Sequence, residues 1–116
     1  MNAEEFIHVI KWVVRDAAII NTIDVLARPP GRRPSQELLD QAKWYKSLSG
    51  QERSLLADVL AQAVDDAVFG FLCVIDGVRV VEDGPIKGQF QLSYVKDKPE
   101  IVNPPDIMLH ELYNSW

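Results

Sequence analysis

The segment from Ser49 to Gly77 is the feature that most constrains how this chain can fold. Ser49 and Glu52 have the spacing of a capping box, in which each side chain satisfies a free amide of the first helical turn. Gly77 is a natural stop, because glycine readily ends a helix. The segment therefore predicts one long helix over about residues 50–76.

This helix changes character halfway along. In its first half one side is apolar, with Leu55, Leu56, Val59, Leu60, Ala63, Val64 and Ala67, and the opposite stripe is Asp58, Gln62 and Asp65. From Val68 to Ile75 no residue is charged, so this half is apolar on all sides. Such a helix is normally buried, so other residues must cover it. The competing interpretation is a strand over 68–74, since periodicity alone does not assign short apolar runs.

Two further helices precede the long one. Asn2 and Glu5 predict a capped helix over about residues 3–26, and Ser35 predicts the start of another over about 36–46. The apolar arc of the first helix comprises Phe6, Ile10, Val13, Ala17 and Ile20.

Two carboxylates, Asp16 and Asp24, fall on or beside that arc. Buried carboxylates are costly unless they are paired. Either they bind the arginines of the following loop, or the helix ends earlier, near Asn21.

Short strands and turns follow Gly77. Residues 78–102 predict a small antiparallel β-hairpin or meander, with possible strands at 78–81, 89–95 and 100–102, in which Phe90, Leu92 and Tyr94 alternate onto one face. We expect this face to lie over the second half of the long helix.

A short C-terminal helix over about residues 105–114 completes the pattern, and its apolar side could cover another face of the long helix. The fold class predicted for residues 1–116, as a single domain, is α+β and mostly α. Its centre is a three-helix core with a long central helix.

Composition narrows the class of protein. The chain is 47% hydrophobic and 25% charged, with a net charge of −5, as in a globular protein that does not bind nucleic acid. Glu4 and Glu5 stand where a signal peptide needs positive charge, and no apolar run reaches the length of a membrane span. We therefore expect a cytoplasmic protein without membrane contact. Cys73, inside the apolar run, is expected to be a small buried residue.

Three arginines, Arg28, Arg32 and Arg33, surround the Pro-Pro-Gly turn between the first two helices. Guanidinium groups held in fixed positions bind phosphate or carboxylate well, so this loop is a possible contact for an anion or a partner. The alternative is a rigid loop whose arginines pair with acidic residues of the same molecule.

Motifs that would identify an enzyme are missing from the sequence. His110 and Glu111 begin a zinc-protease motif, but Asn114 stands where the second histidine is required. Asp58, Gln62 and Asp65, with Asp66 beside them, could hold a cation or act as an acid/base pair, although a solvated helix face predicts the same residues. We therefore expect no catalytic residue, cofactor or metal.

Four blocks of the sequence, PPGRRP, KWYKSLS, FGFLCVIDGVRVVEDGPIKGQFQLSYV and LHELYN, occur in that order. Together they resemble a family of small uncharacterised bacterial proteins, and the resemblance covers nearly the whole chain. It implies a cytoplasmic, single-domain bacterial protein and supplies no functional residues.

The leading hypothesis is a non-enzymatic interaction protein that forms a homo-oligomer or binds another protein, as an inhibitor or immunity-type protein does. Its expected interface residues are Phe69, Leu72, Trp12, Trp44 and Trp116. The rival hypothesis is a small enzyme or ligand-binding protein with a pocket between the β element and the helices. The expected floor of that pocket is Arg79, Tyr94 and His110.

Overall fold

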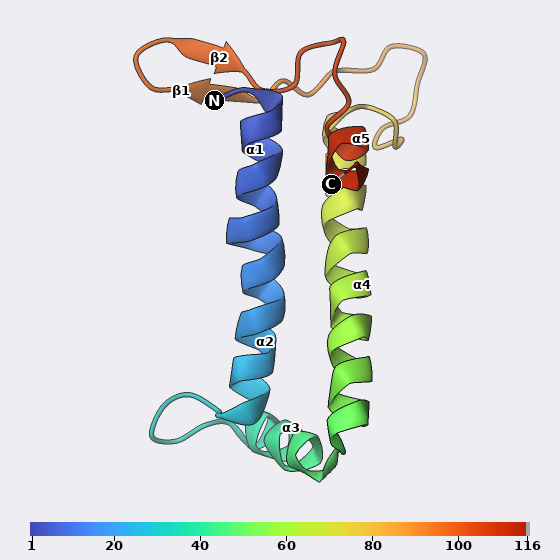
Figure 1. Cartoon of the computed structure of the whole chain (residues 1–116). Helices are drawn as coiled ribbons and strands as arrows, with labels where there is room; N and C mark the ends of the chain where they lie inside the picture. Colours follow the sequence, from blue (N-terminus) through green and yellow to red (C-terminus); the bar gives the residue numbers. More distant parts are fainter. Residues whose placement is uncertain (116) are drawn as a thin grey trace.

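Two long helical arms run antiparallel and set the shape of the protein (Figure 1). The first arm comprises α1 (Ala3–Val9), a π-helical segment (Ile10–Asp16) and α2 (Ala17–Ala27). The second arm is α4 (Gly50–Ile75). α3 (Gln36–Ser47) crosses from one arm to the other at one end of the molecule.

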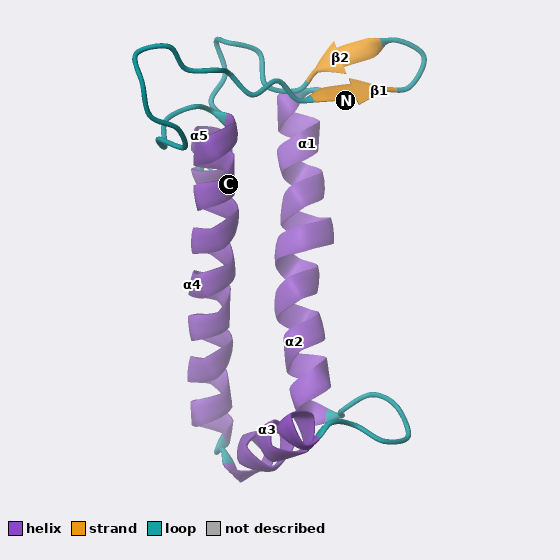
Figure 2. Cartoon of the chain, turned by 180° about the vertical axis from the view of Figure 1, so that it is seen from behind, coloured by secondary structure: helices purple, strands orange, loops and turns teal. Residues whose placement is uncertain are grey.

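The opposite end holds the β element and the last helix (Figure 2). β1 (Ser93–Val95) and β2 (Pro99–Ile101) pair antiparallel, and α5 (Leu109–Asn114) lies beside α4. The computed structural model describes residues 1–115. Over this range the fold is α+β and mostly α, as the sequence predicts.

Capping side chains begin three of the helices where the sequence places them. Asn2 Oδ1 accepts a hydrogen bond from Glu5 N at 2.9 Å, and Ser49 Oγ accepts one from Glu52 N at 3.1 Å. Each glutamate carboxylate in turn accepts a hydrogen bond from the amide of its cap residue, which completes both capping boxes. Ser35 caps α3.

Both long arms remain helical through the segments for which the sequence left an alternative open. α4 is helical through the whole apolar run, so the alternative strand over 68–74 is wrong. The helix stops before Gly77, whose φ of +76° favours glycine. The first arm remains helical to Ala27, so an end near Asn21 is wrong as well.

The buried core lies where α1, α4 and α5 meet. It consists of Ala3, Ile7, Leu72, Val102, Leu109 and Tyr113. Phe69 is partly buried and packs against this cluster. Leu72 is only 2% exposed, so it belongs to the core of a single chain, and its assignment to an interface is wrong. Within one chain, α5 packs against α4, and Ala3 and Ile7 of α1 share a buried cluster with Leu72.

The β element is smaller than predicted and lies elsewhere. The strands have three residues each, and residues 78–91 contain no strand. The hairpin lies at the start of α1 and not over α4 (Figure 1). Leu92 packs against the core, but Phe90 and Tyr94 are exposed, so the expected apolar face does not cover the long helix.

α5 also begins later than predicted, at Leu109. Asp76, at the end of α4, accepts hydrogen bonds from Leu109 N at 3.0 Å and His110 N at 2.8 Å. A carboxylate at this position satisfies free amides of the first helical turn. The start of α5 is therefore fixed by a residue of another helix, which local sequence patterns do not reveal.

Candidate functional site

An exposed apolar ridge runs along α4. The ridge consists of Leu55, Val59, Ala63, Ala67 and Phe71, which are spaced four residues apart and are all exposed. Leu55 and Val59 are each 58% exposed, and Phe71 is 64% exposed. Residues four apart form the ridges that interdigitate when helices pack. The amphipathic half of α4 therefore leaves part of its apolar side without cover from residues 1–115.

The first arm and α3 also expose large apolar side chains. Trp12 is 76% exposed, Val13 61% and Ile20 57%. In the π-helical segment more residues fill each turn, so those after Ile10 lie at other angles than the spacing of an α-helix predicts. Trp44 of α3 is 50% exposed.

Trp12 and Trp44 are therefore available for an interface. Trp116, the third expected interface tryptophan, lies outside the described residues.

The molecule is extended for its length. Its radius of gyration is 18.5 Å, whereas a compact chain of this length has about 13 Å. Its accessible surface is 8643 Å², which exceeds by about 2,200 Å² the value of about 6,400 Å² expected for a folded monomer of this mass. The excess reflects the open arrangement of the arms, the exposed apolar residues on them and the 77–91 loop, in which every residue is exposed.

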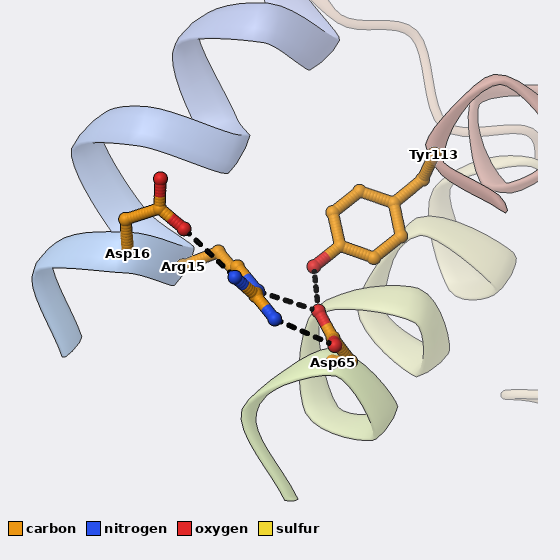
Figure 3. Close-up of polar contacts among 4 residues, drawn as sticks. All are labelled: Arg15, Asp16, Asp65 and Tyr113. Atoms are coloured by element: carbon orange, nitrogen blue, oxygen red, sulfur yellow. Dashed lines mark hydrogen bonds and ion pairs between the residues drawn. The ribbon is translucent and has the colours of Figure 1, made fainter. Parts of the chain in front are cut away.

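A polar cluster joins the two arms at the level of the π-helical segment (Figure 3). Arg15 donates to both oxygens of Asp65, from Nε at 2.9 Å and from Nη2 at 3.1 Å. Arg15 Nη1 also donates to Asp16 Oδ1 at 2.9 Å. From α5, Tyr113 Oη donates to Asp65 Oδ1 at 2.6 Å. Asp65 therefore connects three helical segments.

The electrostatics of this cluster hold each group in one protonation state. The hydrogen bonds from Arg15 lower the pKa of Asp65 below its usual value. Burial, together with the hydrogen bond to Asp65, raises the pKa of the Tyr113 phenol well above its usual value. Lys11 lies over the Tyr113 ring at 4.9 Å, and burial lowers its pKa. An ionised carboxylate beside a neutral phenol suits a structural link between the arms.

The arginines of the loop before α3 remain apart from this cluster. Arg28, Arg32 and Arg33 are exposed, and none forms an ion pair with another described residue. Asp16 pairs with the neighbouring Arg15 instead, and Asp24 is exposed. The expectation that these arginines pair with acidic residues of the same molecule is therefore wrong for residues 1–115.

An open cavity of about 630 Å³ lies between the end of α4, the 77–91 loop and the segment leading to α5. Arg79 lines it, as the pocket hypothesis expects, but Tyr94 and His110 do not. His110 Nδ1 instead contacts Asp76 Oδ2 at 2.6 Å. The three residues expected to form one floor are therefore in three different places.

The role of Asp65 in the polar cluster was not predicted from the sequence. Its position opposite the apolar side of α4 indicated a solvated stripe. Arg15, on the polar side of the first helix, has the complementary charge, but nothing in the sequence pairs the two.

Cys73 is free and buried, as expected.

Among residues 1–115, no group of three or more His, Cys, Asp or Glu residues is placed to hold a metal ion. Over the same range no helix is long and apolar enough to cross a membrane. No family model, curated protein or solved structure matches this chain. The resemblance to small uncharacterised bacterial proteins stays a prediction.

Proposed function

We propose that this chain is a non-enzymatic interaction protein and that its partner is a second copy of itself, bound through the ridge on α4. The observation that carries the proposal is the run of exposed apolar residues every four positions from Leu55 to Phe71. A row with this spacing packs into the matching groove of another helix.

The sizes of the side chains along the ridge support a symmetric partner. Ala63 and Ala67 are small and central, whereas Leu55, Val59 and Phe71 are larger. Small residues at a crossing point let two helix axes approach closely, and the interaxial distance depends on the side chains at that contact. In a two-fold arrangement centred near Ala63, Val59 meets the partner's Ala67. Because a two-fold interface uses the same patch twice, such a patch must be complementary to itself.

The exposed area also fits a dimer. Each chain exposes about 2,200 Å² more surface than a compact monomer of its mass. Stable homodimers bury roughly 2,000 Å² or more in total. Covering the ridge, together with other exposed apolar residues on the arms, would contribute to that area.

A cytoplasmic location stays part of the proposal.

Gel filtration with light scattering tests the proposal. The wild-type protein is expected to have twice the chain mass of 13.1 kDa. Ala63→Glu places a charge at the centre of the ridge and is expected to give a monomer. Gln62→Glu adds the same charge at an exposed neighbouring position off the ridge, and it should remain a dimer.

Circular dichroism of each variant checks that the helices persist. A strictly monomeric wild type, or equal dissociation by both substitutions, would overturn the assignment of the ridge. Binding of a different protein to a monomeric wild type would indicate a heterologous partner instead.

A further inference from the structure

We propose that the cavity beside Arg79 binds a small anionic ligand, a carboxylate or phosphate ester with an apolar body. The site is separate from the α4 ridge and does not depend on self-association. The cavity volume of about 630 Å³ lies within the range of small-molecule sites, roughly 300 to 1,000 Å³.

Gly70 has no side chain, and this leaves room for the Arg79 guanidinium to lie against α4. A Cβ at Gly70 would lie 2.6 Å from Arg79 Nη1, 3.3 Å from Cζ and 3.4 Å from Nη2. The guanidinium group therefore lies directly on the helix backbone. Glycine inside a helix costs about 1 kcal/mol relative to alanine, so Gly70 preserves this contact at the expense of helix stability.

Two cationic side chains, Arg79 and Lys87, and two acidic ones, Asp76 and Glu82, line the cavity. Neither Arg79 nor Lys87 forms an ion pair or side-chain hydrogen bond with any residue in the 1–115 range. Glu82 Oε1 accepts a hydrogen bond from Gly88 N at 3.0 Å. The Asp76 carboxylate is 1% exposed and is engaged by α5. Among residues 1–115 the two cations therefore have no ion pair, whereas both carboxylates accept backbone hydrogen bonds.

Apolar residues form part of the remaining lining, together with Gln89 and Gln91, and one wall is held in place. Val74, Phe90 and Ile107 line the cavity. Asn103 fixes one wall, because its Oδ1 accepts from Leu92 N at 2.7 Å and its Nδ2 donates to the carbonyl oxygen of Phe90 at 2.9 Å. The wall is therefore ordered by contacts within the chain and needs no ligand to position it.

These features define the chemistry of the ligand. A guanidinium group presents a planar set of donors that matches carboxylate and phosphate oxygens. Lys87 adds a second positive charge, and the apolar walls suit an aliphatic or aromatic group attached to the anion. Inorganic phosphate alone would use the cations and leave the apolar walls without contact.

Isothermal titration calorimetry with phenyl phosphate tests the site. Inorganic phosphate, titrated separately, measures binding of the charged group alone, and phenol measures binding of the ring alone. We expect saturable binding of phenyl phosphate that is tighter than binding of either probe. Arg79→Met is expected to weaken binding about tenfold or more, because it removes a charge-assisted hydrogen bond. Arg32→Met, at the opposite end of the molecule, is the matched control and should bind like wild type.

Gly70→Ala is the second test, because alanine favours the helix while its methyl group displaces the guanidinium. We expect intact helical content with weakened phenyl phosphate binding. Equal binding of phenol and phenyl phosphate, wild-type binding by Arg79→Met, or no binding throughout the millimolar range would overturn the proposal. None of these outcomes changes the expected mass of the dimer, so the two proposals fail separately.

Discussion

Tyr113→Phe removes a single hydroxyl group from the link between the arms. The Tyr113 ring is buried and keeps its place in the core, whereas the lost group donates to Asp65 Oδ1 at 2.6 Å. A hydrogen bond to a charged group contributes about 1.5 to 3 kcal/mol. The Asp65 side chain is 42% exposed, so water replaces part of the lost interaction. We therefore expect a loss of about 1 to 2 kcal/mol in the free energy of unfolding.

Urea unfolding followed by circular dichroism measures this loss, with every variant at the same protein concentration because self-association shifts apparent stability. For a chain of 116 residues, 1 kcal/mol corresponds to about 4 °C in Tm, so thermal unfolding should show a decrease of about 4 to 8 °C. Tyr94→Phe removes the same group from an exposed side chain of β1 and should change little.

The pH dependence provides a second measure of the same bond. Burial and the bond to Asp65 raise the pKa of the Tyr113 phenol in the folded protein. The stability that this phenol contributes is therefore fully present below the unfolded pKa of about 10 and is lost as pH rises above that value. Tyr113→Phe should lack this decrease. If Tyr113→Phe is as stable as wild type, or if Tyr94→Phe loses as much, the hydroxyl does not link the arms.

Three further predictions concern single residues. Because Arg15 lowers the pKa of Asp65, the stability that the Asp65 carboxylate contributes is present above the unfolded pKa of about 3.9 and is lost as pH falls below that value. Asp65→Asn should therefore reduce the loss of unfolding free energy at acid pH, measured from pH 2 to 6. Leu72→Ala should lower unfolding free energy by about 2 to 5 kcal/mol without changing the mass seen by light scattering, and a smaller loss would contradict its place in the core. Gly77→Ala, at a φ of +76°, should cost about 1 to 2 kcal/mol in urea unfolding. Gly88→Ala, in open space without a positive φ, should cost little, and equal losses would refute the backbone argument.

The helices could be predicted because the signals for them are local. Ser49 and Glu52 are three residues apart, so their capping box is visible in the sequence. The apolar run after Val68 correctly predicts burial of Leu72, but burial on every side is wrong for Phe71, which is 64% exposed. The π-helical segment was not predictable in this way. Its wider turns shift the angle of each residue, and the apolar arc that includes Val13 therefore fails to be a buried face.

Contacts between distant segments account for the rest of the differences. Asp65 and Arg15 are 50 residues apart, and Asp76 and His110 are 34 apart. Neither pair has a pattern that distinguishes it from other acidic and basic residues on helices. The exposed arginines Arg32 and Arg33 show the reverse case, because opposite charges in the sequence suggested partners that the fold keeps away from them.

The cap on α5 sets an order for folding. α5 has only six residues, and so short a helix is not stable alone in water. Its first amides depend on Asp76, so α5 can form only after the last turn of α4 is in place. Tyr113 lies in α5, so its bond to Asp65 exists only while α5 is closed. We therefore expect α5 to form only when the end of α4 is in place, and its bond to the polar cluster to open whenever α5 opens.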